Sequence, residues 1–392
     1  MKNLLFICSL LFSSVSMFSF ASTQVEQSDN SQVCNIGIVR ITADFSTARM
    51  DKCSVGAKNE YFITLIPENT PINSSPWYAF KVEADKPTNI KIIMTVQGDK
   101  HRYPPKISKD SKHWELQEYK LDGERLVMHM NVSKGATFIA GQEIINNQYY
   151  VDWAKKLQKS ADVSHDIFGE STQGRPLYKI ESESQGKEWI VILGRQHPPE
   201  VTGALGLFPF VETLLAKTTL AKRFREKYKI LVIPNINPDG VFAGNWRHNA
   251  NGFDLNRDWN KFNQIETKHI NDYLEKLVAQ GQKIKFAIDF HSTQRDVFYT
   301  MPVNNDVEEK YLVQHWLDAL DQQMPNFRVL QKPGNNPDAG VSKQYFADKF
   351  KAHAITYEMG DNTDRVEINR IAFNASNLLM ETLLSDVDHN KK

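Results

Sequence analysis

The chain has 392 residues, of which 41% are hydrophobic and 24% are charged; this composition is typical of a globular protein, and the length predicts two domains. Basic and acidic residues number 47 each, so the overall charge excludes the strongly basic class of nucleic-acid-binding proteins and gives no sign of attraction to an anionic membrane surface. Charge alone therefore does not indicate the partner.

Residues 1–21 have the pattern of a secretory signal peptide. Lys2 precedes an apolar run over residues 4–20, and Ser19-Phe20-Ala21 offers small residues at the positions that a signal peptidase recognises. An uncleaved membrane anchor is the alternative, but the run is short and interrupted by serines. We expect a cleaved signal peptide and a secreted or periplasmic mature protein without stable membrane insertion.

The mature chain would retain two cysteines, Cys34 and Cys53, which lie nineteen residues apart. In an oxidising compartment such a pair predicts a disulfide that closes a short loop. Two buried free thiols are the alternative. No Cys-x-x-Cys or neighbouring histidine pattern indicates a metal site at these cysteines.

Residues 22–147 contain short segments in which apolar and polar residues alternate, separated by prolines and glycines. This spacing is typical of antiparallel strands in two packed sheets. We therefore predict an all-β sandwich domain over residues 22–147, with no residue that takes part in chemistry. The predicted strands are 61–66, 77–82, 90–96, 114–119 and 125–132.

The pattern changes near Asn146, after which apolar runs alternate with longer segments of helical spacing. That alternation predicts an α/β domain with a largely parallel sheet over residues 148–386, followed by a frayed tail at 387–392. The predicted strands are 189–193, 230–233, 286–290 and 354–357, and the predicted helices are 149–159, 202–216, 264–280 and 307–324.

Candidate catalytic residues follow the ends of these strands. His197 and Glu200 come after the first strand, His291 ends the third, and Glu358 ends the fourth. Since the carboxyl ends of parallel strands face one crevice, these side chains should converge. Imidazole and carboxylate groups are ordinary zinc ligands, and a catalytic zinc keeps three protein ligands, so His197, Glu200 and His291 form a candidate metal site.

Each of these residues also has a simpler explanation. His197-x-x-Glu200 alone is a weak motif that fits a polar turn, and a histidine at a strand end is often satisfied by backbone groups. Glu358 lies in an apolar segment, where desolvation can raise its pKa towards that of a working base, but a salt bridge to Arg365 or another cation is the competing explanation.

A second group of candidates lies in residues 234–259, a segment rich in Asn, Asp and Gly. Such residues build turns, which accounts for the glycines and prolines but leaves Arg247 and Arg257 unexplained. Guanidinium groups bind carboxylates through paired hydrogen bonds. One arginine is therefore suited to a substrate carboxylate and the other to an oxyanion beside a metal.

Together these motifs resemble the zinc carboxypeptidases of the carboxypeptidase A superfamily, and more closely the cytosolic carboxypeptidases and their bacterial relatives. The resemblance covers about residues 149–384, and the nine-residue spacing from Arg247 to Asn256 favours the second subgroup. It implies a carboxypeptidase-like α/β domain, with a mixed, largely parallel central sheet flanked by helices, preceded by the β-sandwich. The motifs, in chain order, are His197-x-x-Glu200, Pro234 to Gly240, Asp254-Leu255-Asn256-Arg257, Phe290-His291-Ser292-Thr293 and Tyr357-Glu358.

The resemblance also implies the chemistry. His197, Glu200 and His291 would hold one Zn²⁺ per chain, and Glu358 would act as general base on the metal-bound water. Asp254 is suited to orient His197. The implied activity is that of a zinc exopeptidase, which hydrolyses the C-terminal bond of a peptide with a free terminal carboxylate.

Other residues would bind the substrate. Arg247 would stabilise the oxyanion, while Asn256 and Arg257 would hold the terminal carboxylate. Lys343 lies in the stretch that should line the pocket for the leaving residue, which suggests a preference for acidic residues; a solvated lysine on a helix face is the alternative. The tyrosine that covers the substrate in digestive relatives has no assigned counterpart, and Tyr345 is only a guess.

Two other functions are left open by the sequence. A cell-wall (murein) peptide amidase or carboxypeptidase would use the same residues on a different substrate. A non-catalytic binding protein belongs to another class, and it is disfavoured because every expected metal ligand and the base are present.

Overall fold

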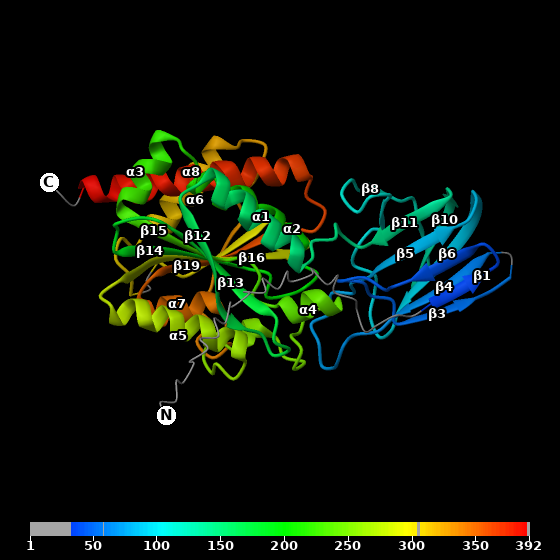
Figure 1. The fold of residues 1–392 in the computed structure, drawn as a ribbon. Helices are drawn as coiled ribbons and strands as arrows, with labels where there is room; N and C mark the ends of the chain where they lie inside the picture. The colour runs from blue at the N-terminus through cyan, green and yellow to red at the C-terminus, as the bar shows by residue number, and fades with distance from the viewer. Residues whose placement is uncertain (1–32, 58, 304–305, 390–392) are drawn as a thin grey trace, which may run out of the picture.

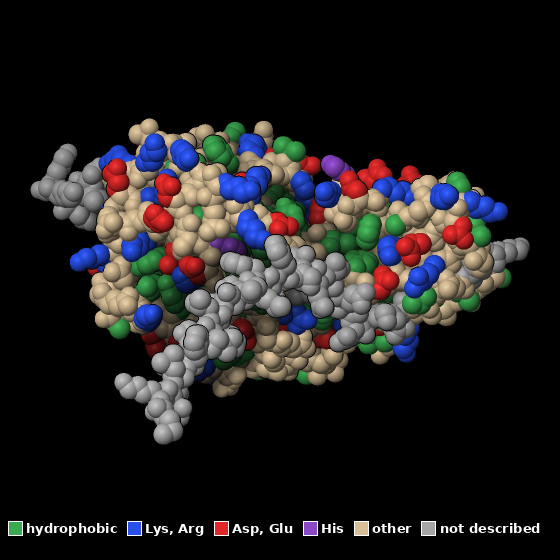
Figure 2. Space-filling model, in the orientation of Figure 1, with side chains coloured by type: hydrophobic (Ala, Val, Ile, Leu, Met, Phe, Trp, Pro, Cys, Tyr) green, Lys and Arg blue, Asp and Glu red, His purple; other side chains and the backbone are tan. Residues whose placement is uncertain are grey.

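The computed structural model describes residues 33–57, 59–303 and 306–389. They form an N-terminal region of β-strands and a larger region in which helices surround a sheet, with the two regions side by side (Figure 1). The predicted signal peptide and residues 390–392 of the predicted tail lie outside the described residues. Acidic and basic side chains are interspersed over the visible face of both regions (Figure 2).

The N-terminal region contains two sheets that share one hydrophobic core. A disulfide joins Cys34 in the first sheet to Cys53 in the second, which confirms the predicted pair. The first sheet has the order β1 (Val33–Ile36), β2 (Val39–Thr42), β5 (Ala79–Ala84), β11 (Gly135–Ala140), β7 (Lys106–Ser108) and β8 (Glu115–Leu116). The second has the order β3 (Lys52–Val55), β4 (Glu60–Leu65), β6 (Thr88–Val96), β10 (Arg125–Val132) and β9 (Lys120–Asp122).

The predicted strands of this region are found with different accuracy. The strand predicted at 125–132 matches β10, and those at 61–66 and 90–96 match β4 and β6 to within two residues. The strand predicted at 114–119 is too long, because only Glu115 and Leu116 pair with a neighbour, Ile107 and Lys106 of β7. A turn precedes this short strand. In the turn, Asp110 Oδ1 accepts the backbone N–H groups of Lys112 and His113 at 2.9 and 2.8 Å.

The second region is built on one mixed sheet of eight strands. Its four central strands, β15, β14, β16 and β19, run parallel, whereas β13 and β17 pair antiparallel with β15 and β19. The order is β12 (Val163–Glu170), β13 (Pro176–Ser182), β15 (Tyr228–Ile233), β14 (Glu188–Gly194), β16 (Lys283–Thr293), β19 (His353–Gly360), β17 (Val297–Thr300) and β18 (Gln331–Pro333).

Helices cover both faces of this sheet (Figure 1). In β14, Ile190 and Ile192 pack with one group of helices, and Val191 and Leu193 pack with the other. Burial on both faces explains why the central strands are continuous apolar runs. One face carries α2 (Val201–Leu214), α3 (Thr219–Lys227), α6 (Leu312–Gln323) and α8 (Arg365–His389), and the other carries α5 (Ile265–Ala279) and α7 (Ser342–Phe350).

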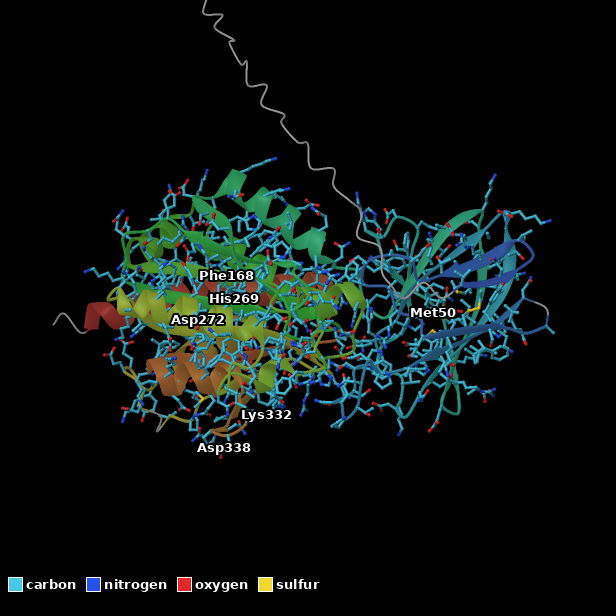
Figure 3. The ribbon with its side chains drawn as sticks, turned by 60° about the horizontal axis from the view of Figure 1, so that its bottom comes forward. Met50, Phe168, His269, Asp272, Lys332 and Asp338 are labelled. Carbon is cyan, nitrogen blue, oxygen red and sulfur yellow. A yellow bond between two sulfur atoms is a disulfide. The ribbon has the colours of Figure 1, made fainter. Side chains whose placement is uncertain are left out.

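Helices α1 and α5 contact β12, the strand at one edge of the sheet. Helix α1 (Asn147–Ser160) begins at Asn146, whose side chain accepts the N–H of Tyr149, and it packs near β12 and α4 (Pro238–Ala243). On the other side of β12, Phe168 lies next to His269 of α5 (Figure 3), where Gly169 leaves room for the imidazole ring.

The predicted helices at 149–159, 202–216 and 264–280 correspond to α1, α2 and α5. The start predicted for the fourth, at 307, is wrong, because α6 begins at Leu312. Glu309 has a φ of +53°, in the left-handed region, so a right-handed α-helix that started at 307 could not continue through this residue. Among the described residues no single helix is long and apolar enough to cross a membrane; only α2 and α3 together pass by length and composition, with an 88° bend between them.

Candidate active site

His197 and Glu200 lie in the loop that connects β14 to α2, at the carboxyl end of the strand. Arg195 turns the chain out of β14 with a φ of +56°. Its Nε donates to Pro198 O at 2.8 Å and its Nη1 donates to the hydroxyl of Tyr150 at 2.8 Å. The loop is therefore held from both sides, and the side chains of His197 and Glu200 are buried.

His291 of β16 completes a group of three possible metal ligands. One ligand atom from each of His197, Glu200 and His291 lies within 4.8 Å of the others. Nδ1 of His197 is 2.9 Å from Glu200 Oε1, and Nδ1 of His291 is 2.8 Å from Glu200 Oε2. Two imidazole nitrogens and one carboxylate thus converge, and this donor set fits a catalytic zinc.

A carboxylate holds the far nitrogen of each histidine. Nε2 of His197 lies 2.8 Å from Asp254 Oδ1, and Nε2 of His291 lies 2.9 Å from Asp289 Oδ2. Since an ionised carboxylate only accepts hydrogen bonds, Asp254 and Asp289 would keep a proton on each Nε2 when a metal replaces the proton that Nδ1 shares with Glu200, so each Nδ1 would be the metal-binding atom. Asp254 occupies the position expected from the sequence, whereas Asp289 was not predicted.

The charges around Glu200 are balanced within the cluster. Burial on its own would raise the pKa of Glu200, but the charges of His197 and His291 hold that pKa well below its ordinary value. Burial likewise opposes ionisation of Asp254, yet His197 and Arg247 keep the pKa of Asp254 lowered. Both carboxylates are therefore ionised at neutral pH.

Glu358 of β19 lies directly across from His291 in the parallel pair of β16 and β19. Its Oε2 is buried and has no hydrogen-bond partner in the described part of the chain. Burial, together with the nearby charge of Glu200, raises the pKa of Glu358 to about 7. The alternative of a salt bridge to Arg365 is wrong, because that guanidinium donates to Glu143 through Nε and Nη2, each at 2.8 Å.

The residues predicted to bind substrate lie around the same centre. Arg247 donates from Nε to Asp254 Oδ2 at 2.7 Å, which leaves its two Nη atoms for other groups. Asn256 and Arg257 lie in a short 3₁₀ helix (Leu255–Arg257) that begins at Asp254. Ser342 N donates to Asn256 Oδ1 at 2.9 Å, so the amide is held with its Nδ2 side near His291.

Lys343 and Tyr345 both belong to α7 but have different surroundings. Lys343 is 5% exposed, and its Nζ donates to the carbonyl groups of Thr300 and Gly334, so the alternative of a solvated lysine is wrong. Burial lowers the pKa of Lys343 to about 8. The guess that Tyr345 covers the substrate is also wrong: its hydroxyl is buried and donates to Asn271 Oδ1 at 2.9 Å, away from the cleft.

All eight predicted site residues line one cleft of about 670 Å³. A cavity of about 750 Å³ between the two regions contains none of them, although it is the larger of the two. The chemistry therefore belongs to the smaller, more polar cleft. The eight residues are His197, Glu200, Arg247, Asn256, Arg257, His291, Lys343 and Glu358.

Further residues line this cleft, and among those that the sequence did not indicate are Tyr299 of β17 and Asn73, Ser74 and Arg102 of the N-terminal region. The N-terminal region, in which no residue was expected to take part in chemistry, therefore lines part of the cleft. Arg102 donates from Nε to Asp361 Oδ2 at 2.8 Å and from Nη2 to Ser292 O at 3.1 Å, next to His291. No motif surrounds Arg102, so no local sequence signal could have identified it.

Comparisons with known proteins agree with this geometry. A family model described as zinc carboxypeptidase matches residues 150–380. An uncharacterised protein from Zymomonas mobilis is 22% identical over 77% of this chain and 82% of its own length. Cytosolic carboxypeptidase 6 from Caenorhabditis elegans is 30% identical over 44% of this chain and 40% of its own, so the chain spans less than half of that relative.

Two solved structures share the fold of both regions. A metallo-carboxypeptidase from Burkholderia cenocepacia aligns with a TM-score of 0.75 and 17% identity, covering 90% of this chain and 100% of its own. A metallo-carboxypeptidase from Pseudomonas aeruginosa, solved in complex with (2-guanidinoethylmercapto)succinic acid, aligns with a TM-score of 0.73 and 19% identity over 88% and 99% of the two chains. Because the family match covers more than half of the sequence, this chain belongs to the zinc carboxypeptidase family and is a metallocarboxypeptidase, a hydrolase.

Proposed function

We propose that this protein is an exopeptidase that removes C-terminal residues from peptides, with one Zn²⁺ per chain held by His197, Glu200 and His291. The convergence of these three donors beside the unpaired carboxylate of Glu358 is the observation that supports it. When bound, zinc lowers the pKa of water to about 7 and polarises the scissile carbonyl.

The chain's own residues supply the remaining chemistry. Glu358 accepts a proton from the attacking water and donates it to the departing amine; a pKa near 7 suits a group that must do both. Arg247 donates from its Nη atoms to the oxyanion. Asn256 and Arg257 hold the terminal carboxylate, and this contact restricts hydrolysis to the last peptide bond.

Lys343 supports a preference for acidic leaving residues. Its ammonium group is buried at the cleft, and the two protein groups to which it donates are neutral carbonyls. No described acidic side chain forms an ion pair with Lys343. A buried cation without a counter-charge favours an anionic ligand, so a glutamate or aspartate side chain in this pocket would complete its pairing.

The setting of the enzyme is also part of the proposal. The signal-like pattern of residues 1–21 and the disulfide between Cys34 and Cys53 support a secreted or periplasmic protein. The two sheets with a shared core support an accessory β-sandwich domain ahead of the catalytic domain. N-terminal sequencing of the exported protein tests the first point, with Ser22 as the expected first residue.

The exopeptidase activity is tested by metal analysis and digestion of a peptide library followed by mass spectrometry. We expect about one zinc per chain and stepwise loss of C-terminal residues. Peptides with an amidated C-terminus are the matched control and should resist, because Asn256 and Arg257 need a carboxylate. Internal cleavage, or turnover without zinc, would contradict the proposal, and cleavage of muropeptides alone would favour the cell-wall function instead.

The acidic preference is tested on peptides that differ only in a terminal Glu, Phe or Lys. We expect the wild type to release Glu fastest and the variant Lys343→Glu to lose that order. Lys343→Met, which removes the charge but keeps an unbranched apolar chain, should reduce the preference without reversing it. A wild type that shows no preference for Glu would rule the idea out.

A further inference from the structure

We propose that Glu68 of the N-terminal region is a positioning residue for hydrolysis, which holds Arg247 in place through the backbone of residues 246–248. The inference builds on the proposed role of Arg247 at the oxyanion. Glu68 does not line the cleft, so any effect it has on turnover must pass through the segment that it holds.

One carboxylate binds three consecutive backbone N–H groups. Glu68 lies in the loop between β4 and β5; its Oε2 accepts from Trp246 N at 2.8 Å, and its Oε1 accepts from Arg247 N at 2.9 Å and His248 N at 2.8 Å. The side chain of Glu68 is 9% exposed. An ionised acceptor in such a shielded place makes strong hydrogen bonds, because water competes little for them.

The residue next to Glu68 holds the same segment from its other end. Asn69 Nδ2 donates to Gly252 O at 3.0 Å, and Asn69 Oδ1 lies 2.7 Å from Nδ1 of His248. Residues 245–252 contain no regular helix or strand, so they have no ladder of their own backbone hydrogen bonds. Side chains of the α/β region hold part of the segment, since Asn237 and Asn245 both donate to His248 O, but the N–H groups of residues 246–248 are bound by Glu68.

The held segment carries groups that lie at the chemistry. Arg247 lines the cleft and donates to Asp254, and Asp254 in turn accepts from Nε2 of the metal-ligand candidate His197. A shift of the backbone at 247 would displace the guanidinium directly. When a group that stabilises the transition state is displaced slightly, kcat falls more than the affinity for the substrate does.

The experiment compares two carboxylates at the same interface. Glu143 also links the two regions, through Arg365, but it does not line the cleft. In zinc-loaded full-length protein we expect Glu68→Gln to lower kcat by roughly 10- to 100-fold, less than the loss of a whole oxyanion donor, with KM changed less than about threefold. Glu143→Gln should lower the thermal midpoint but leave kcat within about twofold.

A double-mutant cycle distinguishes positioning from general damage. If Glu68 acts through Arg247, adding Glu68→Gln to Arg247→Ala should reduce kcat no further than Arg247→Ala alone. Glu68→Asp, which keeps the charge but shortens the reach, should give an intermediate kcat and carries the same test if Glu68→Gln does not fold.

The outcomes separate this inference from the proposed function. Independent, multiplicative losses in the double mutant, or an unchanged kcat in Glu68→Gln or Glu68→Asp, overturn the positioning role while wild-type exopeptidase activity stands. An unchanged kcat in Arg247→Ala overturns both the oxyanion role of Arg247 and the positioning role of Glu68. Absence of zinc-dependent exopeptidase activity in the wild type overturns the proposed function itself.

Discussion

The two histidines of the site present the same ring nitrogen to Glu200 because each has an aspartate at its other nitrogen. Asp289 is itself held, since Gln196 and Ser342 both donate to its Oδ2. The motifs identified the possible metal ligands and Asp254, but Asp289 lies inside an apolar strand and has no motif of its own. His291 lies only two residues from Asp289, but Gln196 and Ser342, which hold the carboxylate, are brought close only by the fold.

Replacement of the proposed base tests the chemistry at the residue scale. Glu358→Gln keeps the size of the side chain but cannot accept a proton, so kcat should fall by about 10²- to 10⁴-fold while the zinc content is unchanged. Steady-state kinetics and metal analysis measure the two quantities. Glu367→Gln, which changes a carboxylate paired with Arg370 on α8, is the control and should retain full kcat.

The pH dependence of specificity tests Lys343. Because burial lowers the pKa of this ammonium group to about 8, the positive charge is present below that pH and lost above it. The ratio of kcat/KM for peptides ending in Glu to those ending in Phe should therefore fall by roughly tenfold as pH rises through 8, as expected for loss of a charge-assisted hydrogen bond.

The control for this measurement is the variant without the ammonium group. In Lys343→Met the ratio should be low at every pH and show no step near 8. A step of the same size in Lys343→Met would assign the titration to another group.

At the scale of elements, the position of the metal site depends on how closely α2 packs against β16. A Cβ atom added to Gly203 would lie 2.6 Å from His291 O and 2.8 Å from His291 C, both backbone atoms. Real Cβ atoms do not approach backbone so closely. Glycine at this point lets α2, which follows Glu200 directly, lie against the strand that carries His291.

Two glycine replacements in the same helix make this testable. Gly203→Ala should lower the free energy of unfolding by about 1–3 kcal/mol, because overpacking outweighs the helix propensity that alanine gains. It should also weaken zinc binding, since His291 moves away from Glu200. Denaturant unfolding and chelator competition measure the two effects.

The matched control is Gly206→Ala, three residues further along α2. Its Cβ would meet the Cε atom of Met359 at 2.4 Å, which is the end of a flexible side chain that can turn aside. We expect a smaller loss of stability and unchanged zinc affinity. Equal losses of stability and of zinc affinity in the two variants would show that the close packing of Gly203 against His291 does not position the metal site.

At the scale of the whole molecule, the N-terminal region and the α/β region build the cleft together. Arg102 reaches from the first region to Asp361 and to the backbone beside His291, and Glu68 holds the segment of Arg247. The N-terminal region therefore contacts both the backbone next to His291 and the segment that carries Arg247. Its own stability should matter to the enzyme, and the disulfide is the simplest place to test that stability.

Removing the disulfide should destabilise the N-terminal region without changing the chemistry. The bridge from Cys34 to Cys53 closes a loop with a sequence separation of 19 residues. Loop-closure entropy predicts that the double variant Cys34→Ser/Cys53→Ser loses about 3 kcal/mol of unfolding free energy. Urea unfolding measures the loss, and kcat at a temperature where both proteins are folded should be the same.

Reduced wild-type protein serves as the control for the double variant. Its unfolding midpoint should match that of the variant, because both lack the same cross-link. If oxidised and reduced wild-type protein unfolded at the same urea concentration, the bridge would contribute nothing to stability.

The sequence by itself determined the α/β pattern, the central strands, the three candidate ligands and the family resemblance. It could do so because buried parallel strands are continuous apolar runs, and because the polar residues at their carboxyl ends face one crevice wherever the loops then lead. His197, Glu200, His291 and Glu358 are each adjacent to such a strand end, so local signals were sufficient to identify them.

Only the tertiary structure decided which residues complete the site. Gln196 and Ser342, which hold Asp289, and Asp361, which pairs with Arg102, lie far away in the sequence from these residues, and no local pattern distinguishes Asp289 or Arg102 from ordinary polar residues. Lys343 is likewise indistinguishable from a surface lysine until α7 is packed against its neighbours. Burial and long-range hydrogen bonds are properties of the packed chain, and for that reason the shape and the charge of the cleft could not be predicted from the sequence.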